Sequence, residues 1–161
     1  MEKILKRVYS SRPLSLFLRI FSHFVTVFSA VVFLLCFLFF LKESRAAALS
    51  YLAILGFPFL LVSLLRRLID AKRPYQVYDF YQNPPKNKDG SSFPSRHAFS
   101  AFAIGTVCIF AYPVLGFALL LAGAVMCVCR VLLGVHFIRD VVAGAACGIS
   151  CSLIGTLILL F

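Results

Sequence analysis

Long apolar runs, separated by short polar segments, are the feature that most constrains the fold of this chain. Of its 161 residues, 61% are hydrophobic and only 14% are charged. A soluble domain of this length could not bury that much apolar surface. A helix that crosses a bilayer needs about 20 mainly apolar residues, each rising about 1.5 Å. We therefore predict an all-α, multi-pass membrane protein whose helices form one bundle.

The apolar runs predict five membrane-spanning helices. We place them at about residues 14–41, 46–65, 98–112, 114–133 and 140–161. The third run is short, so we expect this helix to borrow residues from its polar flank. Only Tyr112 and Pro113 separate the third and fourth runs, which predicts a tight helical hairpin. No internal repeat is evident, and we predict one membrane-embedded domain over residues 1–161.

Three short polar clusters interrupt the apolar sequence, at residues 66–74, 93–97 and 130–140. The first ends the second span, the second begins the third span, and the last joins the fourth and fifth spans. Because a hairpin follows the third span, all three clusters should emerge on the same face of the membrane. Ionisable groups beside membrane spans are costly and mark function by default. We therefore expect one composite site, next to a turn-forming loop at residues 82–90 that should lie outside the bilayer.

The first cluster offers two guanidinium groups. Arg66 and Arg73 are seven residues apart, or two helical turns, so both can point the same way if the helix continues. Pro74 biases Arg73 away from helical geometry, which predicts that the span ends there. Paired guanidiniums suit a phosphate dianion, because their forked donors match its oxygens.

The second and third clusters add the groups that phosphoryl transfer needs. Ser95 and the backbone amides around Arg96 can cradle an anion at the start of the third span, and His97 can protonate a departing alkoxide or phosphate. Arg130 provides a further phosphate contact. His136 and Asp140 are spaced i, i+4, neighbours on one helical face. A carboxylate beside an imidazole fixes its tautomer and leaves the other nitrogen free to attack phosphorus.

Together these residues resemble the type 2 phosphatidic acid phosphatase (PAP2) superfamily, which shares its active site with the vanadium haloperoxidases. The family pattern reads K-x6-R-P, P-S-G-H and S-R-x5-H-x3-D. This chain matches it with Arg66-x6-Arg73-Pro74, Pro94-Ser95-Arg96-His97 and Cys129-Arg130-x5-His136-x3-Asp140. The resemblance covers roughly residues 60–161, and haloperoxidases themselves are soluble, unlike this chain.

The resemblance implies a role for each matched residue. His136 would be the nucleophile that forms a phosphohistidine, Asp140 its orienting partner and His97 the general acid. The phosphoryl group would be held by the side chains of Arg66, Arg73, Ser95 and Arg130 and by the backbone N–H of Arg96. No metal or other cofactor is implied.

The chain departs from the family pattern at three positions. Arg66 replaces the usual Lys, which keeps the charge but changes the geometry. Cys129 replaces Ser, a better hydrogen-bond donor. Arg96 replaces Gly, which leaves two alternatives: strain if the position requires a positive φ, or an added phosphate contact, such as one to the second phosphate of a diphosphate. Five spans are also one fewer than the six common in the family.

The predicted function is an integral-membrane lipid phosphate phosphatase acting on a phosphomonoester or a prenyl diphosphate. Undecaprenyl diphosphate, phosphatidate and phosphatidylglycerophosphate are the substrates to test first. One alternative is a phosphotransferase that moves the phosphoryl group to an alcohol. Another is an inactive membrane protein that binds anionic lipid. The expected partners are the lipid substrate and membrane lipids, with no obligate protein partner.

The charge and cysteine content fit this interpretation. The net charge of +10 is explained by anionic headgroups and phosphate ligands rather than by nucleic acid. None of the six cysteines lies in a zinc-type or redox C-x-x-C pattern, so we expect small hydrophobic side chains packed between helices. Gly144 and Gly148 form a small-xxx-small pair that predicts close helix packing inside the bundle rather than dimerisation.

The side of the cell membrane that bears the site stays open. Basic residues of the N-terminal segment lie on the same face as the three clusters, whereas the opposite face offers only Lys42 and Arg45. The positive-inside rule would place that face in the cytoplasm. Resemblance to bacterial family members implies the extracytoplasmic face instead.

Overall fold

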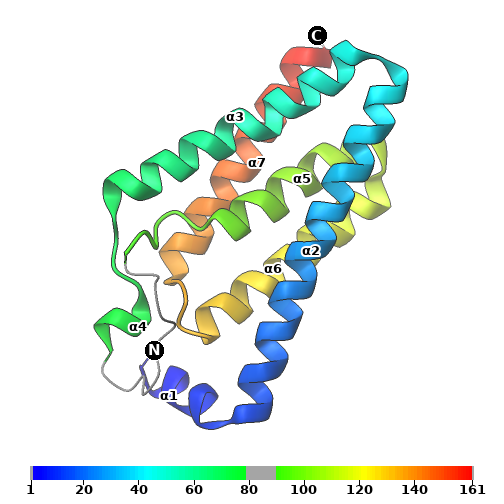
Figure 1. The fold of residues 1–161 in the computed structure, drawn as a ribbon. Coiled ribbons are helices and arrows are strands. Elements are labelled where there is room, and N and C mark those ends of the chain that lie inside the picture. Colours follow the sequence, from blue (N-terminus) through cyan, green and yellow to red (C-terminus); the bar gives the residue numbers. More distant parts are fainter. Residues whose placement is uncertain (1, 79–89, 161) are drawn as a thin grey trace.

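The computed structural model describes residues 2–78 and 90–160, and these residues form seven helices and no strand (Figure 1). The helices are α1 (Glu2–Ser10), α2 (Arg12–Glu43), α3 (Arg45–Ile69), α4 (Pro74–Val77), α5 (Arg96–Ala111), α6 (Pro113–Leu132) and α7 (Ile138–Leu160). By length and composition, α2, α3, α6 and α7 can each cross a membrane, and α5 is a shorter apolar helix. The all-α membrane bundle is thus confirmed: four of the five predicted spans are α2, α3, α6 and α7, and the third, predicted to be short, is the shorter apolar helix α5.

Helix α2 shows how the bundle divides its surface between protein and lipid. Its buried residues recur every three or four positions along one face: Leu18, Ser22, Val25, Ser29, Val32 and Cys36. That spacing is the period of a helix face packed against neighbours. Other positions expose large apolar side chains, including Phe17, Phe24 and Leu35. A wide exposed apolar surface of this kind suits contact with lipid tails rather than with water.

Helix α5 lies inside the bundle and packs mainly against α6 and α7. Its contact with α7 is close because α7 carries glycines there. A Cβ atom added at Gly144 would collide with the carbonyl oxygen of Ser95, and one added at Gly148 would collide with that of Phe99. The small-xxx-small pair therefore packs within the chain, as predicted.

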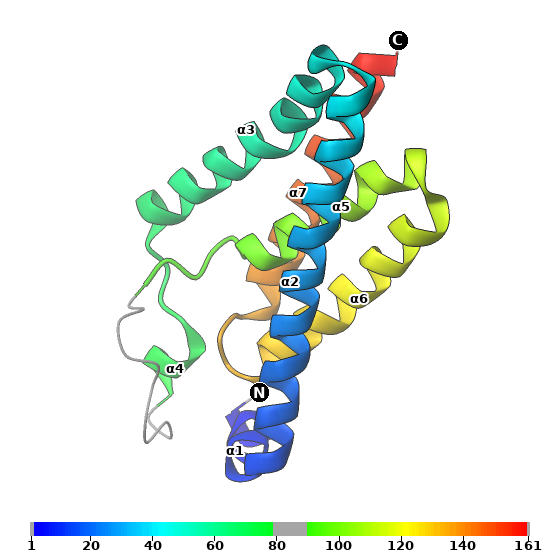
Figure 2. The same ribbon diagram turned by 45° about the vertical axis from the view of Figure 1, so that its right-hand side comes forward.

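The three polar clusters lie at one end of the bundle. The C-terminal ends of α3 and α6 and the N-terminal ends of α5 and α7 all point away from the α2–α3 turn and toward the left and lower part of Figures 1 and 2. The α2–α3 turn at Ser44 lies at the opposite end, where the Ser44 hydroxyl caps α3 by accepting from Ala47 N–H at 3.0 Å. The prediction that the clusters share one face is confirmed, whereas the predicted loop at 82–90, apart from Gly90, lies outside the described residues.

Helix α3 extends past the apolar run at 46–65 but ends before Pro74, where the sequence predicted its end. The helix ends at Ile69, and Asp70 adopts a left-handed conformation with φ 42°. The Asp70 carboxylate accepts hydrogen bonds from the N–H and hydroxyl of Ser91, at 2.9 and 3.3 Å. Arg73 is extended, as expected of a residue before proline, and Pro74 begins the short helix α4. Arg66 and Arg73 are therefore not on one continuous helix.

Candidate active site

His136 lies in the connection between α6 and α7 and is almost fully buried, with 1% of its surface exposed. The connection folds back on the end of α6, because the N–H groups of Val135 and His136 both point to the Arg130 carbonyl, at 3.1 and 3.4 Å. Gly134 makes the turn possible with a φ of 63°, a conformation that costs glycine little. The local fold thus aims the imidazole into the bundle.

Asp140 lies in the first turn of α7 and is fully buried. Its Oδ2 is 3.7 Å from His136 Nδ1, too long for a direct hydrogen bond. It accepts from the Phe137 N–H at 2.9 Å. His136 precedes the start of α7 at Ile138, so the predicted placement of both residues on one helical face is only half correct: the two are neighbours, but only Asp140 is helical.

Ser92 fills the gap between the imidazole and the carboxylate. Its hydroxyl donates to Asp140 Oδ2 at 2.5 Å, and its oxygen lies 3.3 Å from His136 Nδ1. Because the hydroxyl proton is directed to the carboxylate, the oxygen can only accept from Nδ1. This assigns the proton to Nδ1 and leaves Nε2 with a free lone pair. Sequence reasoning missed Ser92, and its only signal was a polar residue close before Pro94.

The environment of His136 favours the neutral imidazole. Burial lowers the pKa of His136 below its ordinary value of 6.5, and the charges of Arg73 and Arg66 lower it further. Asp140 acts in the opposite direction but does not reverse the shift. A neutral imidazole at physiological pH is the form that can act as a nucleophile.

Three arginines, Arg66, Arg73 and Arg130, surround this pair, and we call them the arginine cluster. Arg66 and Arg73 are both 6% exposed. Arg66 Nη1 donates to the Pro94 carbonyl at 3.1 Å. Arg73 donates through Nε to Gly90 O at 3.1 Å and through Nη1 to Val135 O at 3.4 Å. These neutral acceptors fix the guanidinium groups without neutralising their charge.

The arginine cluster is short of acceptors. Among the described residues, Arg130 Nε is buried without a hydrogen-bond partner. Asp140 is the carboxylate that interacts electrostatically with Arg66 and Arg73. Buried cations are costly unless they are paired. The cluster is therefore arranged to receive an anion, and the forked guanidinium donors suit a phosphoryl group.

Helix α5 brings Ser95 and His97 to the same end. Ser95 is the N-cap of α5 and is fully buried: its hydroxyl accepts from Ala98 N–H at 3.5 Å and its N–H donates to the Asp140 carbonyl at 2.9 Å. His97 is half-buried and interacts electrostatically with Arg130 and His136. The predicted site residues of α5 are thus tied to those of α6 and α7.

The family to which the chain belongs follows from its sequence. The family model of the PAP2 superfamily matches residues 47–160, which include all three polar clusters. This chain belongs to the PAP2 superfamily. A comparison with curated proteins found no match.

Two solved structures share the fold. A PAP2-type phosphatidylglycerolphosphate phosphatase from Bacillus subtilis superposes with a TM-score of 0.72 at 20% identity, over 99% of this chain and 84% of that one. LpxE from Aquifex aeolicus gives a TM-score of 0.69 at 21% identity, over 96% of this chain and 93% of that one. The likeness extends through α1 and α2, upstream of the region that the family model matches.

The structure shows the surroundings of two of the departures from the PAP2 pattern, Arg96 and Cys129. Among the described residues, only Asp70 and Ser91 combine a positive φ with a side chain. Arg96 is the first residue of α5, so its replacement of Gly brings no backbone strain. Cys129 is buried and packs with Val8, Leu18 and Leu133, the environment of a small hydrophobic side chain. All six cysteines are free.

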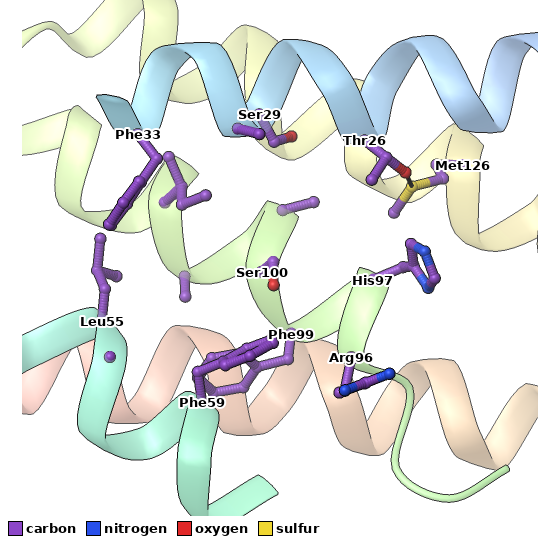
Figure 3. A pocket seen from close by; sticks show the side chains of 15 residues that line it. Thr26, Ser29, Phe33, Leu55, Phe59, Arg96, His97, Phe99, Ser100 and Met126 are labelled. Carbon is purple, nitrogen blue, oxygen red and sulfur yellow. Dashed lines mark hydrogen bonds between the residues drawn. The ribbon is translucent and has the colours of Figure 1, made fainter. Parts of the chain in front are cut away.

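A cavity of about 490 Å³ begins beside the site and runs between helices. Its lining comes from α2, α3, α5 and α6 and is largely apolar. Figure 3 shows His97 and Arg96 toward one end of the cavity and Phe33 and Leu55 toward the other. The cavity thus joins a polar end near the arginine cluster to an apolar interior.

Proposed function

We propose that this PAP2 protein is an integral-membrane lipid phosphate phosphatase that forms a phosphohistidine and needs no metal. The observation that carries the proposal is the arginine cluster, which surrounds a buried, neutral His136. The single carboxylate of Asp140 cannot balance the positive charge of these arginines. Such a site is complementary to a transferring phosphoryl group, whose charge is spread over its oxygens. The substrate is a lipid phosphomonoester or a prenyl diphosphate.

In the first step, His136 Nε2 attacks phosphorus and forms an N–P bond. The bond from phosphorus to the leaving oxygen breaks, and that oxygen departs with the electron pair and receives a proton from His97. The arginine cluster holds the charge on the phosphoryl oxygens. The developing imidazolium is stabilised through Ser92 by the Asp140 carboxylate, since Ser92 contacts both groups.

In the second step, water attacks the phosphohistidine and the N–P bond breaks. His97, now neutral, accepts a proton from that water, so inorganic phosphate leaves and both histidines return to their starting state. His97 thus acts as the general acid in the first step and as the general base in the second.

The cavity supports a lipid as the substrate. Its apolar walls suit a hydrocarbon tail, and its polar end holds His97 beside the phosphate site. Helices α2 and α3 meet at the Ser44 turn and diverge toward the site in Figures 1 and 2, and residues of both helices line the cavity. A lipid can therefore enter from the bilayer with its headgroup at the arginines and its tail between these helices.

The test is a substrate panel with product analysis. Purified protein in detergent is given phosphatidate, phosphatidylglycerophosphate and undecaprenyl diphosphate, with and without an alcohol acceptor. We expect inorganic phosphate as the product in both conditions. A phosphorylated alcohol would instead indicate phosphotransfer. Absence of turnover for every lipid, in protein shown to be folded, would contradict the proposal and favour a lipid-binding role.

A further inference from the structure

Arg96 stands at the boundary between the phosphate site and the apolar cavity. It occupies the first position of α5, directly before His97, and both residues line the cavity (Figure 3). Its side chain is exposed, and its Cζ lies 6.0 Å from the centre of the Phe59 ring of α3. A ring face at this distance supports a guanidinium without neutralising it. Arg96 is thus a charged group placed where a headgroup joins its tail.

The positive charge of the site exceeds what one phosphate can balance. Arg96 interacts electrostatically with Arg66 and Arg73 and forms no ion pair among the described residues. With the arginine cluster it makes four guanidinium groups, against the single carboxylate of Asp140. Arg139 approaches Asp140 from solvent at 3.6 Å and only adds to the excess. Four guanidiniums against one carboxylate therefore leave at least three positive charges for a ligand to balance.

Ligand charge separates the two substrate classes. A phosphomonoester carries about two negative charges at neutral pH, which leaves at least one guanidinium uncompensated. A diphosphate monoester carries about one more, because its inner phosphate adds an ionised oxygen. A lipid diphosphate thus matches the charge of the four guanidiniums and Asp140 more closely than a lipid monophosphate does.

We propose that Arg96 binds the inner phosphate of a lipid diphosphate and makes this protein selective for diphosphates. The inference rests on the proposed function. The terminal phosphate lies in the arginine cluster and the tail in the cavity, so the inner phosphate lies between them, beside Arg96 and His97. His136 Nε2 forms a bond to the terminal phosphorus, while the bond from that phosphorus to the bridging oxygen breaks. The bridging oxygen leaves with the electron pair as part of the lipid monophosphate, with a proton from His97.

Arg96 also assists this step by its position. The leaving group is itself a phosphate, and the negative charge that develops on it lies next to the guanidinium. An interaction that strengthens as charge develops lowers the barrier as well as favouring binding. A lipid monophosphate, whose leaving group is an alkoxide with no further phosphate, gains little from Arg96.

The experiment compares farnesyl phosphate with farnesyl diphosphate, which share one tail. The measured quantity is the ratio of kcat/KM for the diphosphate to kcat/KM for the monophosphate. We expect Arg96→Gln to lower this ratio about 10-fold or more, as the loss of a charge-assisted hydrogen bond does. Arg96→Lys should retain more of the ratio than Arg96→Gln, and Phe59→Leu should lower it to a smaller extent. The matched control is Arg67→Gln, an exposed arginine of α3 outside the cavity, which should keep the wild-type ratio.

The outcomes separate this inference from the function on which it rests. A wild-type protein that releases phosphate from neither farnesyl lipid nor any lipid of the substrate panel would overturn the proposed function, and this inference with it. Release from panel lipids but from neither farnesyl lipid would overturn this inference alone. A wild-type protein that hydrolyses these lipids, with the same ratio in Arg96→Gln, would overturn the role of Arg96 alone. An equal fall for both lipids would also overturn it, because it would show a general contribution to phosphate binding.

Discussion

Ser92 couples the proposed nucleophile to its carboxylate, since His136 and Asp140 are too far apart for a direct hydrogen bond. Replacing it, Ser92→Ala, leaves His136 Nδ1 without this acceptor. We expect kcat to fall about 10- to 100-fold, the scale of a lost hydrogen bond to a charged group, with a smaller change in KM. Steady-state kinetics on a lipid phosphate measure both values.

The control for this variant is Ser91→Ala. Ser91 is the neighbouring serine, but its hydroxyl bonds to Asp70 rather than to His136. This change should leave kcat within about 3-fold of wild type, as surface changes usually do. A rise in KM without a fall in kcat for Ser92→Ala would mean that Ser92 supports binding and not the nucleophile.

The lowered pKa of His136 predicts the acid side of the pH profile. Because burial and the nearby arginines hold this pKa below 6.5, the imidazole stays neutral as the pH falls through 6.5 and becomes protonated only at lower pH. The profile of kcat/KM reports the free enzyme. We therefore expect its acid limb to be centred below pH 6.5. The profile is corrected for titration of the substrate phosphate. An acid limb centred above pH 6.5 would contradict the neutral, buried imidazole.

The contact between α5 and α7 sets the spacing of the whole site, because Ser95 of α5 bonds to the Asp140 carbonyl of α7. Gly144→Ala places a methyl group against the Ser95 carbonyl. We expect it to destabilise the protein by about 1–3 kcal/mol, the usual cost of overpacking, and to lower activity. Thermal unfolding in detergent measures the first effect.

Gly56→Ala is the matched control for this change. A Cβ atom at Gly56 in α3 would meet nothing within 4 Å, and alanine is the better helix former by up to about 1 kcal/mol. Gly56→Ala should therefore be as stable as wild type or more so. Equal stability of the two variants would show that α5 and α7 do not need their close approach.

The elements themselves could be predicted because apolar length alone specifies a membrane span. The hairpin at Tyr112 then placed the polar clusters on one face. The end of α3 could not be predicted, because Asp70 is held in a left-handed conformation by bonds to Ser91, distant in sequence. Ser92 escaped prediction for the same reason: its partners lie more than 40 residues away. Contacts of this kind depend on tertiary structure and cannot be read from local sequence. The organisation of residues 1–161 as one domain stays a prediction.

At the scale of the molecule, the cavity between α2 and α3 predicts a dependence on tail length. Gly56 lines this cavity, so Gly56→Leu fills part of it with a side chain. We expect kcat/KM for a long-chain lipid phosphate to fall relative to that for a short, water-soluble phosphate ester, since the tail loses apolar contact. The ratio of the two values is the measurement, with Gly56→Ala as the smaller step. An unchanged ratio for Gly56→Leu would place the tail elsewhere.

The central claim is that the bundle brings three polar clusters together so that His136 carries the phosphoryl group. Phosphate release is measured from a lipid phosphate with purified protein and metal chelated, for wild type and His136→Ala, while quenched samples are analysed for phosphohistidine. We predict a phosphorylated His136 in the quenched wild-type samples. In His136→Ala we predict no phosphohistidine and a loss of activity of about 1000-fold or more, as for other covalent nucleophiles. Phosphate release by His136→Ala near the wild-type rate would contradict the mechanism.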